Sequence, residues 1–340
     1  MSNRLADLLE SKGRLVADGG MGTSLFELGL QAGATPELWN VEFPERIAKV
    51  HQGFVDAGAD IILTNTFGGT RARLDLDGLG DRIDELNRAG VAVALGVAST
   101  AAREVIVAGS VGPTGQLFEP MGELTYAKAV EYFKEQVDSL ASAGAQVLWI
   151  ETLSSTEELA AAVEAAQTVD LPIVSTMSFD THGSTMMGVP PSALANWWTE
   201  NGSAPLAVGA NCGVGPSDVV AAVAEIHEAN PELVVIAKGN CGVPEIIDGT
   251  LWYPTSSDDM TAYAELALDA GARIIGACCG SVPAHIAQIR QVVDRYDPGV
   301  FDFSDVETRL GPTSRSTDAK PKRERRGRRH STTSVQVPSR

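Results

Sequence analysis

Aromatic residues, basic residues and cysteines are all scarce in this 340-residue chain. Aromatics make up 6%, Lys and Arg number 26 against 44 Asp and Glu, and there are four cysteines. No apolar run approaches the roughly 18 residues that cross a bilayer, which excludes a transmembrane protein. The first ten residues mix acids and bases, so no secretory signal is expected. With 44% hydrophobic residues the chain can bury a large core, and we expect a cytoplasmic protein with no membrane partner.

Acidic and basic residues are unevenly distributed along the chain. Residues 311–340 contain nine Lys or Arg against Asp318 and Glu324, whereas the whole chain carries a formal net charge of −18. The acidic remainder repels phosphate backbones, so no nucleic acid is expected at the main domain. The basic segment is rich in Ser, Thr and Pro and lacks apolar periodicity, which predicts a disordered Arg-rich tail over 311–340 after one domain over 1–310. This tail is either a solubilising appendage or a docking segment for an acidic partner or RNA.

Eight short apolar runs recur through the main domain, and each closes on small or polar residues. They are residues 16–20, 61–66, 105–110, 147–151, 173–177, 206–212, 234–240 and 274–279. Runs that are apolar on both faces are typical of parallel strands covered by helices. Segments with helical spacing, such as residues 126–137, lie between them. Eight such alternations predict an α/β fold, specifically a (β/α)8 TIM barrel rather than a doubly wound open sheet.

An Ala-Gly-Ala motif precedes the second, fourth and eighth runs. Its glycines are Gly58, Gly144 and Gly271. Glycine at this place is typical of a helix that ends in a left-handed turn immediately before the next element. The motif therefore predicts that three helices of the barrel end in the same way.

The four cysteines lie at the ends of the sixth and eighth runs or directly after the seventh. Cys212 ends the sixth run, and Cys278 and Cys279 end the eighth. In a closed barrel these strand ends lie two apart on one rim, where three thiolates can hold Zn²⁺ and leave its fourth position open for catalysis. Adjacent residues of a strand face opposite ways, so the backbone must bend at the Cys pair. The alternative is that small apolar cysteines fill the barrel top. Cys241, after the seventh run, is a fourth ligand or a neighbour.

Six motifs, in order and each at a run end, resemble the homocysteine S-methyltransferase family over roughly residues 10–300. They are Asp-Gly-Gly-Met-Gly-Thr at 18–23, Thr-Asn-Thr-Phe at 64–67, Gly-Ser-Val-Gly-Pro at 109–113, Ile-Glu-Thr at 150–152, Gly-Ala-Asn-Cys-Gly at 209–213 and Gly-Ala-Cys-Cys-Gly at 276–280. The resemblance implies a zinc-bearing barrel with Cys212, Cys278 and Cys279 as ligands. It also implies that Cys241 is not a ligand, because the family usually carries a small residue there.

The same resemblance implies how the substrate lies. It places the amino-acid end of homocysteine near Asp18 and Glu151, with Gly19 and Gly20 allowing a close backbone approach. Asn211 and Asn240 are then hydrogen-bond donors to metal-bound sulfur. A free thiol has a pKa near about 8.5, and zinc would deprotonate the homocysteine sulfur at neutral pH. Methyl transfer to that sulfur is an in-line displacement that forms methionine and needs no general base.

The motifs leave two possibilities open for the methyl donor. A quaternary ammonium donor such as glycine betaine favours an aromatic cage, and Trp39 matches a tryptophan that contacts donor or substrate in the family's betaine enzymes. Other candidate rings are Phe67, Phe118, Tyr126, Trp252 and Tyr253. However, Thr152 and Gly68 stand where animal betaine enzymes carry tyrosines. The segments 64–67 and 151–152 are more similar to the homocysteine module of cobalamin-dependent methionine synthase.

Two functional hypotheses follow. The first is a zinc-dependent homocysteine S-methyltransferase that uses glycine betaine or a related onium compound. The second is the homocysteine-activating subunit of a multi-protein methionine synthase, which takes its methyl group from a separate corrinoid protein, because this chain has no cobalamin-type Asp-x-His-x-x-Gly stretch. A scaffold without turnover would have lost a cysteine or an acid, and a phosphate-binding barrel would carry a basic Gly-rich loop at its last strands. Further copies of the chain are also candidate partners, in a homo-oligomer.

Overall fold

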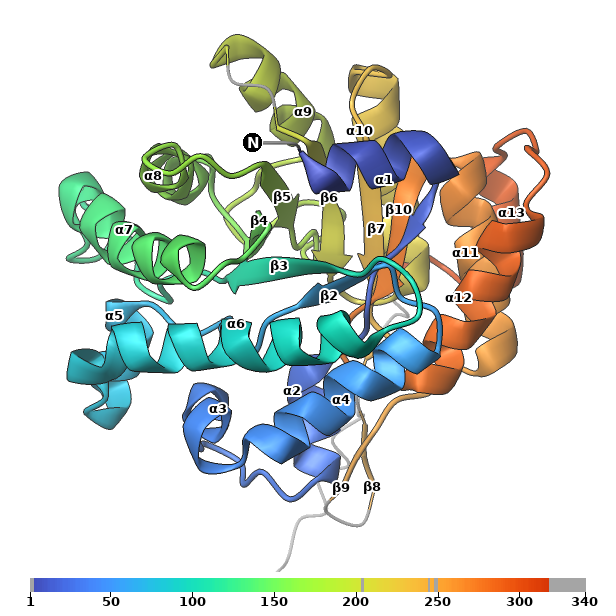
Figure 1. The fold of residues 1–340 in the computed structure, drawn as a ribbon. Coiled ribbons are helices and arrows are strands. Elements are labelled where there is room, and N and C mark those ends of the chain that lie inside the picture. Colours follow the sequence, from blue (N-terminus) through green and yellow to red (C-terminus); the bar gives the residue numbers. More distant parts are fainter. Residues whose placement is uncertain (1–2, 203–204, 244, 248–249, 318–340) are drawn as a thin grey trace, which may run out of the picture.

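A closed barrel of parallel strands forms the centre of the molecule (Figure 1). The computed structural model describes residues 3–202, 205–243, 245–247 and 250–317. The barrel strands are β1 (Leu15–Val16), β2 (Ile61–Leu63), β3 (Ile106–Val111), β4 (Val147–Leu153), β5 (Ile173–Met177), β6 (Ala207–Cys212), β7 (Val235–Gly239) and β10 (Ala272–Ala277). They pair in the order β1-β10-β7-β6-β5-β4-β3-β2, and a parallel bridge from Ala17 to Ile61 brings β1 to β2. The predicted (β/α)8 barrel is confirmed.

Helices surround the barrel on its outer side (Figure 1). They are α1 (Arg4–Lys12), α2 (Met21–Glu27), α3 (Trp39–Glu42), α4 (Pro44–Asp56), α5 (Arg71–Leu74), α6 (Ile83–Thr100), α7 (Tyr126–Ser142), α8 (Thr156–Ala166), α9 (Pro191–Glu200), α10 (Pro216–Ala229), α11 (Ser257–Asp269), α12 (Pro283–Arg295), α13 (Phe303–Leu310) and α14 (Ser314–Thr317). Within the described ranges, no helix combines the length and the apolar character needed to cross a bilayer.

Apolar packing closes the amino-terminal end of the barrel. Leu5, Leu8 and Leu9 of α1 belong to one buried cluster with inward strand residues such as Trp149 and Ile274. A second, larger cluster fills the layer between the strands and the surrounding helices. Because α1 plugs one end of the barrel, the opening that remains lies at the carboxyl ends of the strands, where catalytic groups of this fold are found.

The Ala-Gly-Ala turns have the predicted geometry. Gly58, Gly144 and Gly271 have φ angles of +105°, +98° and +103°. The amide of each glycine donates to the carbonyl three residues earlier, at 3.0–3.1 Å. A Cβ at Gly58 would meet the Arg290 side chain at 2.5 Å, so packing as well as conformation requires glycine there. The three helices do end in the same left-handed turn.

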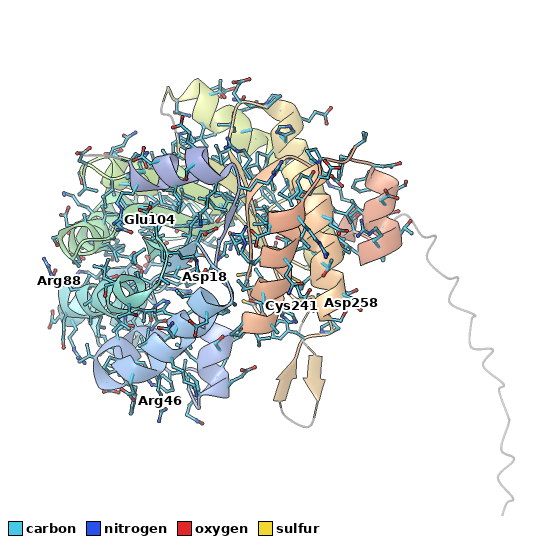
Figure 2. All side chains as sticks on the ribbon, turned by 45° about the vertical axis from the view of Figure 1, so that its right-hand side comes forward. Asp18, Arg46, Arg88, Glu104, Cys241 and Asp258 are labelled. Carbon is cyan, nitrogen blue, oxygen red and sulfur yellow. The ribbon has the colours of Figure 1, made fainter. Side chains whose placement is uncertain are left out.

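Two segments differ from the sequence analysis. An antiparallel hairpin, β8 (Glu245–Ile247) with β9 (Thr250–Trp252), is inserted between β7 and α11 and projects beyond the barrel (Figure 2). Residues 311–317, expected to belong to the disordered tail, instead pack on α10. Asp218 accepts hydrogen bonds from the Ser314 amide and hydroxyl at 2.9 and 2.6 Å, and Arg315 pairs with Glu225 at 3.0 Å. The remainder of the predicted tail, 318–340, lies outside the described residues.

A buried carboxylate ties the start of the chain to its last barrel helix. The Asp60 side chain is 1% exposed and pairs with Lys12 at 2.6 Å and with Arg290 at 2.9 Å. Its second oxygen also accepts from the Val16 amide at 2.9 Å. Asp60, which immediately precedes β2, thus links α1, β1 and α12 at the plugged end of the barrel.

Replacing Asp60 with Ala should lower the free energy of unfolding by about 2 kcal/mol, because it leaves the buried Val16 amide without its acceptor and the partly buried Lys12 and Arg290 without their counter-charge. Urea denaturation followed by circular dichroism measures this. Asp294, an exposed partner of the same Arg290, is the matched control, and Asp294→Ala should cost less than about 1 kcal/mol. Equal losses in the two variants would contradict the role given to Asp60.

Candidate metal and substrate site

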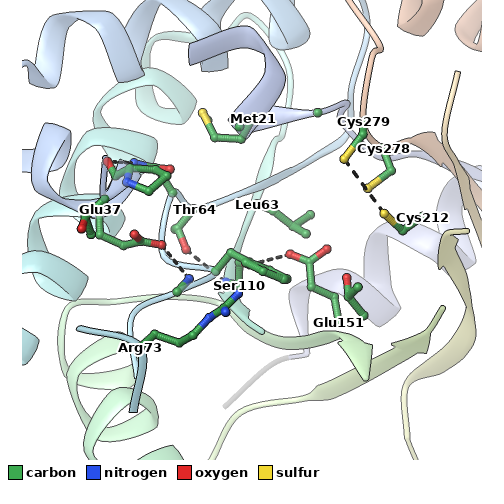
Figure 3. Close-up of a pocket in the computed structure, with 18 of the residues that line it drawn as sticks. Met21, Glu37, Leu63, Thr64, Arg73, Ser110, Glu151, Cys212, Cys278 and Cys279 are labelled. Atoms are coloured by element: carbon green, nitrogen blue, oxygen red, sulfur yellow. Dashed lines mark hydrogen bonds between the residues drawn. The ribbon is translucent and has the colours of Figure 1, made fainter. Parts of the chain in front are cut away.

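Three cysteines converge at the carboxyl ends of β6 and β10. The Sγ atoms of Cys212, Cys278 and Cys279 all lie within 4.8 Å of one another, and those of Cys212 and Cys279 are 4.0 Å apart (Figure 3). Among the described residues, no other group of three or more His, Cys, Asp or Glu side chains brings its ligand atoms this close together. Cys212, Cys278 and Cys279, which we expected to meet because their strands end on one rim of the barrel, do lie together.

The backbone bends at both strand ends so that the thiols face one point. Cys212 has a φ of +62°, a left-handed conformation that is uncommon outside glycine. Strand β10 ends at Ala277, and the Ser281 amide then donates to the Cys278 carbonyl at 3.2 Å in a turn that includes Gly280 at φ +79°. This turn removes the strand alternation that would direct Cys278 and Cys279 to opposite faces.

The chemistry of the three thiols fits a divalent cation. The hydrogen bond that the Cys278 thiol donates to Cys212 raises the pKa of Cys278, and burial adds to this shift, whereas the hydrogen bond accepted from Cys279 opposes it. Three adjacent thiolates would repel one another, and a bound Zn²⁺ offsets that repulsion. Soft sulfur donors favour zinc over magnesium or manganese. The donor set therefore suits zinc and leaves a tetrahedral ion one further position.

Asn240 and Cys241 follow β7 and have different places. The Asn240 amide accepts from the Cys279 backbone at 2.9 Å and donates to the Gly213 carbonyl at 2.8 Å, so it joins the two cysteine loops. Cys241 is buried, and its sulfur lies 3.4 Å from Nδ1 of His285. It is not part of the sulfur cluster. This agrees with the resemblance, which implied that Cys241 is not a ligand.

A cavity of about 540 Å³ extends from the sulfur cluster across the barrel mouth (Figure 3). Its charged lining residues are Asp18, Glu37, Arg73, Asp77, Glu151 and Lys238, and Phe67 and Leu63 contribute apolar surface. Volumes of about 300–1,000 Å³ are usual for small-molecule sites. The cavity therefore provides a place for a small substrate beside the candidate metal.

Asp18 lines the cavity and is held in a buried ion pair with Lys238. Its Oδ1 accepts from Nζ of Lys238 at 2.6 Å and its Oδ2 from the Leu63 amide at 2.7 Å. Both side chains of this ion pair are at most 3% exposed. Sequence reasoning missed Lys238, although a lysine within the apolar run 234–240 indicates a buried ion pair. Each carboxylate oxygen can accept a second hydrogen bond, so Asp18 stays a predicted contact of the substrate ammonium beside its ion pair with Lys238.

Glu151 retains acceptor capacity toward the cavity. One of its oxygens accepts from the Ser110 hydroxyl, and no described residue donates to the other. Burial raises the pKa of Glu151, and the nearby Lys238 ammonium opposes this shift. If all three groups are ionised, Asp18, Lys238 and Glu151 together carry one negative charge. That charge matches one substrate ammonium group.

We expected the Asn211 side-chain amide to donate to the sulfur cluster, but it is hydrogen-bonded to Thr152 instead. Its Oδ1 accepts from the Thr152 amide at 3.0 Å, and its Nδ2 donates to the Thr152 hydroxyl at 2.7 Å. Thr152 has a φ of +63°, a true outlier for a β-branched residue. Both hydrogen bonds of Asn211 therefore hold the strained turn that follows Glu151. Its role is to position the backbone of β4, two strands away in the barrel.

Gly19 and Gly20 line the cavity and permit a close contact within the protein. A Cβ on Gly19 would lie 2.4 Å from the Ser281 hydroxyl, and one on Gly20 would lie 2.6 Å from the Cys278 carbonyl. The Gly20 amide donates to the same Ser281 hydroxyl at 2.8 Å. These glycines allow the loop after β1 to pack directly on the loop that carries Cys278.

The rings proposed for an aromatic cage lie in different places among the described residues. Trp39 packs edge to face on Phe43 at 5.2 Å, carries the Arg46 guanidinium on its ring at 4.7 Å, and does not line the cavity. Among the described lining residues, Phe67 is the one aromatic ring. Phe118 and Tyr126 do not line the cavity, Tyr253 packs on Gly280 beside Cys279, and the Trp252 side chain is outside the described residues. Trp39 and Phe43 are four residues apart at the two ends of the short helix α3, so their rings face each other. This packing directs Trp39 away from a contact with the methyl donor.

Comparisons with known proteins agree with this site. A sequence profile of the family described as homocysteine S-methyltransferase matches residues 15–293. The metallated form of the homocysteine methyltransferase MmuM from Escherichia coli is 25% identical, with a TM-score of 0.70 over 84% of this chain and 99% of that one. Methionine synthase from Mycobacterium tuberculosis is 28% identical over 84% of this chain, and that from Mycobacterium leprae is 27% identical over 86%. The chain spans only about a quarter of the length of these synthases, 25% and 26%.

Cys278→Ser should abolish stoichiometric zinc binding, because two thiolates and a hydroxyl hold zinc far more weakly than three thiolates. Metal analysis of the purified protein after dialysis against zinc measures this. Cys241→Ser is the matched control, since its sulfur lies outside the cluster, and it should retain the metal. Full zinc retention in Cys278→Ser would contradict the ligand assignment.

Lys238→Met should lower the free energy of unfolding by about 3–5 kcal/mol, because it leaves Asp18 buried without its counter-charge. The double variant Asp18→Asn with Lys238→Met should recover much of this loss. Lys128→Met, at an exposed i,i+3 ion pair with Glu131, is the control and should change stability by less than about 1 kcal/mol. Strict additivity of the Asp18 and Lys238 substitutions would refute their coupling.

Proposed function

Because the chain belongs to the homocysteine S-methyltransferase family, as its motifs predicted, we propose that it is a zinc-dependent enzyme that methylates homocysteine to methionine. We propose glycine betaine or a related onium compound as the methyl donor. The observation that carries this proposal is the group of three cysteines at one end of a cavity that also contains Glu151. Their free thiols also fit the reducing conditions of the cytoplasm.

The cysteine cluster accounts for activation of the nucleophile. Cys212, Cys278 and Cys279 would hold the ion, which when bound supplies an open position where a substrate thiol loses its proton near neutral pH. The thiol proton passes to solvent, so no side chain is required as a general base at the sulfur. The lining residues confine the substrate in the cavity, which fixes its orientation for attack.

The acid group at the barrel mouth accounts for recognition of the amino-acid end. The unpartnered oxygen of Glu151 accepts from the homocysteine ammonium, while Ser110 holds the other oxygen in place. The positive charge of Lys238 compensates one of the two negative charges that Asp18 and Glu151 carry when both are ionised. Homocysteine is thereby held at its ammonium by the barrel and at its sulfur by the metal centre, and the sulfur lone pair is directed at the incoming methyl carbon.

A methyl group delivered by a separate corrinoid protein is the second candidate. The similarity to two mycobacterial methionine synthases favours it. Exposed apolar side chains, Leu117 and Met121 after β3 and Met186 after β5, also lie on loops at the same end of the barrel as the cavity. A methyl-carrying protein would contact these loops. Further copies of the chain, in a homo-oligomer, are the other partners proposed for this surface.

The two candidates are separated by incubating the zinc-loaded protein with homocysteine and glycine betaine alone. Methionine and dimethylglycine should form in equal amounts, as measured by mass spectrometry with a deuterated betaine methyl group. Cys278→Ser is the negative control, and Cys241→Ser should retain activity. Methionine formation only after addition of a methylated corrinoid protein would replace the first candidate with the second.

A further inference from the structure

Arg73 lines the cavity, and its positive charge opposes the burial that raises the pKa of the Glu37 and Glu158 carboxyl groups. It lies on α5, and among the described residues its guanidinium makes no hydrogen bond or ion pair, although the side chain is half-buried. Arg71, on the same helix, forms a two-pronged ion pair with Glu135 at 2.8–3.1 Å. The Arg73 guanidinium instead lies 5.9 Å from the centre of the Phe67 ring. A guanidinium group in a cavity with vacant donors is suited to a planar anion such as a carboxylate.

We propose that Arg73 binds the carboxylate of the methyl donor, so that the donor is a small zwitterion with an onium centre and a carboxylate. This inference rests on the proposed onium-dependent function. Two carboxylates are chemically available, that of homocysteine and that of the donor. The position of Arg73 selects between them.

Arg73 and the sulfur cluster occupy different ends of the cavity. In Figure 3, Arg73 and Glu37 lie on the side opposite to the three cysteines, with Glu151 between them. Homocysteine must place its sulfur at the cysteines and its ammonium at Glu151. The Arg73 end therefore remains for the second substrate. A donor whose carboxylate is held there extends its onium centre toward the homocysteine sulfur, as in-line transfer requires.

The surroundings of Arg73 also suit the cationic part of the donor. The Glu37 carboxyl group is buried, and its Oε1 accepts from the Gly68 amide at 2.6 Å. A Cβ at Gly68 would lie 3.0 Å from that oxygen, so Glu37 occupies the space beside the position where betaine enzymes carry a tyrosine. The Phe67 ring offers the donor a π face in place of a full aromatic cage.

The transfer step is balanced with these two substrates alone. The homocysteine sulfur lone pair forms the new bond to the methyl carbon, and the carbon–onium bond breaks with its electron pair remaining on the donor nitrogen or sulfur. A trialkylammonium donor leaves as a tertiary amine, and a sulfonium donor leaves as a neutral thioether. In both cases the leaving molecule keeps its carboxylate on Arg73.

The test compares two sulfonium donors that differ in the carboxylate, dimethylsulfonioacetate and trimethylsulfonium, with zinc-loaded full-length protein. The wild type should prefer the carboxylate donor in kcat/KM. Arg73→Gln should lower kcat/KM for dimethylsulfonioacetate by about 10- to 100-fold, mainly through the donor KM, as expected for hydrogen bonds between charged groups. Activity with trimethylsulfonium and the KM for homocysteine should be unchanged. Arg73→Lys should restore part of the preference.

Arg71→Gln is the matched control, because Arg71 is ion-paired on the same helix and does not line the cavity. Zinc content and thermal unfolding of each variant establish that the site is intact. An increase in the KM for homocysteine in Arg73→Gln would assign Arg73 to the other carboxylate and overturn the inference. Equal losses with both donors would overturn it as well. Failure of the wild type to use any onium donor would refute the proposed function itself, and this inference with it.

Discussion

The site depends on bringing three sulfur atoms from two separate strand ends to one point. Cys212 and Cys279 are 67 residues apart, and barrel closure alone only places their strands two positions from each other on the same rim. The remaining adjustment comes from the backbone. Cys212 adopts a left-handed conformation, and the chain turns after Ala277. Local strain of this kind persists only where the surroundings hold it, and the Asn240 bridge between the two loops is one such restraint.

A second constraint is the charge at the barrel mouth. A lysine and two carboxyl groups are buried in the lining of the same cavity as a sulfur cluster that itself attracts a cation. Because Lys238 neutralises Asp18, these three groups keep one negative charge, that of Glu151, which a single substrate ammonium can neutralise. At the other end of the cavity, Glu37 and Arg73 add one acid and one base. The cavity thus has charged groups at both ends and apolar surface from Leu63 and Phe67, which suits two small zwitterions better than one apolar ligand.

The comparisons place the same barrel in two settings. MmuM from Escherichia coli is covered over 99% of its length, whereas the mycobacterial methionine synthases are covered over about a quarter. The residues matched by the family profile, 15–293, include all eight barrel strands and every residue of the sulfur cluster. The proposed homocysteine chemistry therefore rests on residues of the barrel, and the proposed donor site lies at the other end of the cavity.

The sequence by itself determined the eight strands, the left-handed turns at Gly58, Gly144 and Gly271, and the convergence of Cys212 with the Cys278–Cys279 pair. These features follow from short-range periodicity and from the rule that parallel strands end on one rim. Only the tertiary structure decided the partners of individual side chains. Asp18 lies 220 residues from Lys238, and Asn211 lies 59 residues from Thr152, so nothing in local spacing shows that each pair is hydrogen-bonded. The packing of Trp39 away from the cavity and of residues 311–317 on α10 likewise depends on side-chain direction and surface complementarity, which exist only once the chain has folded.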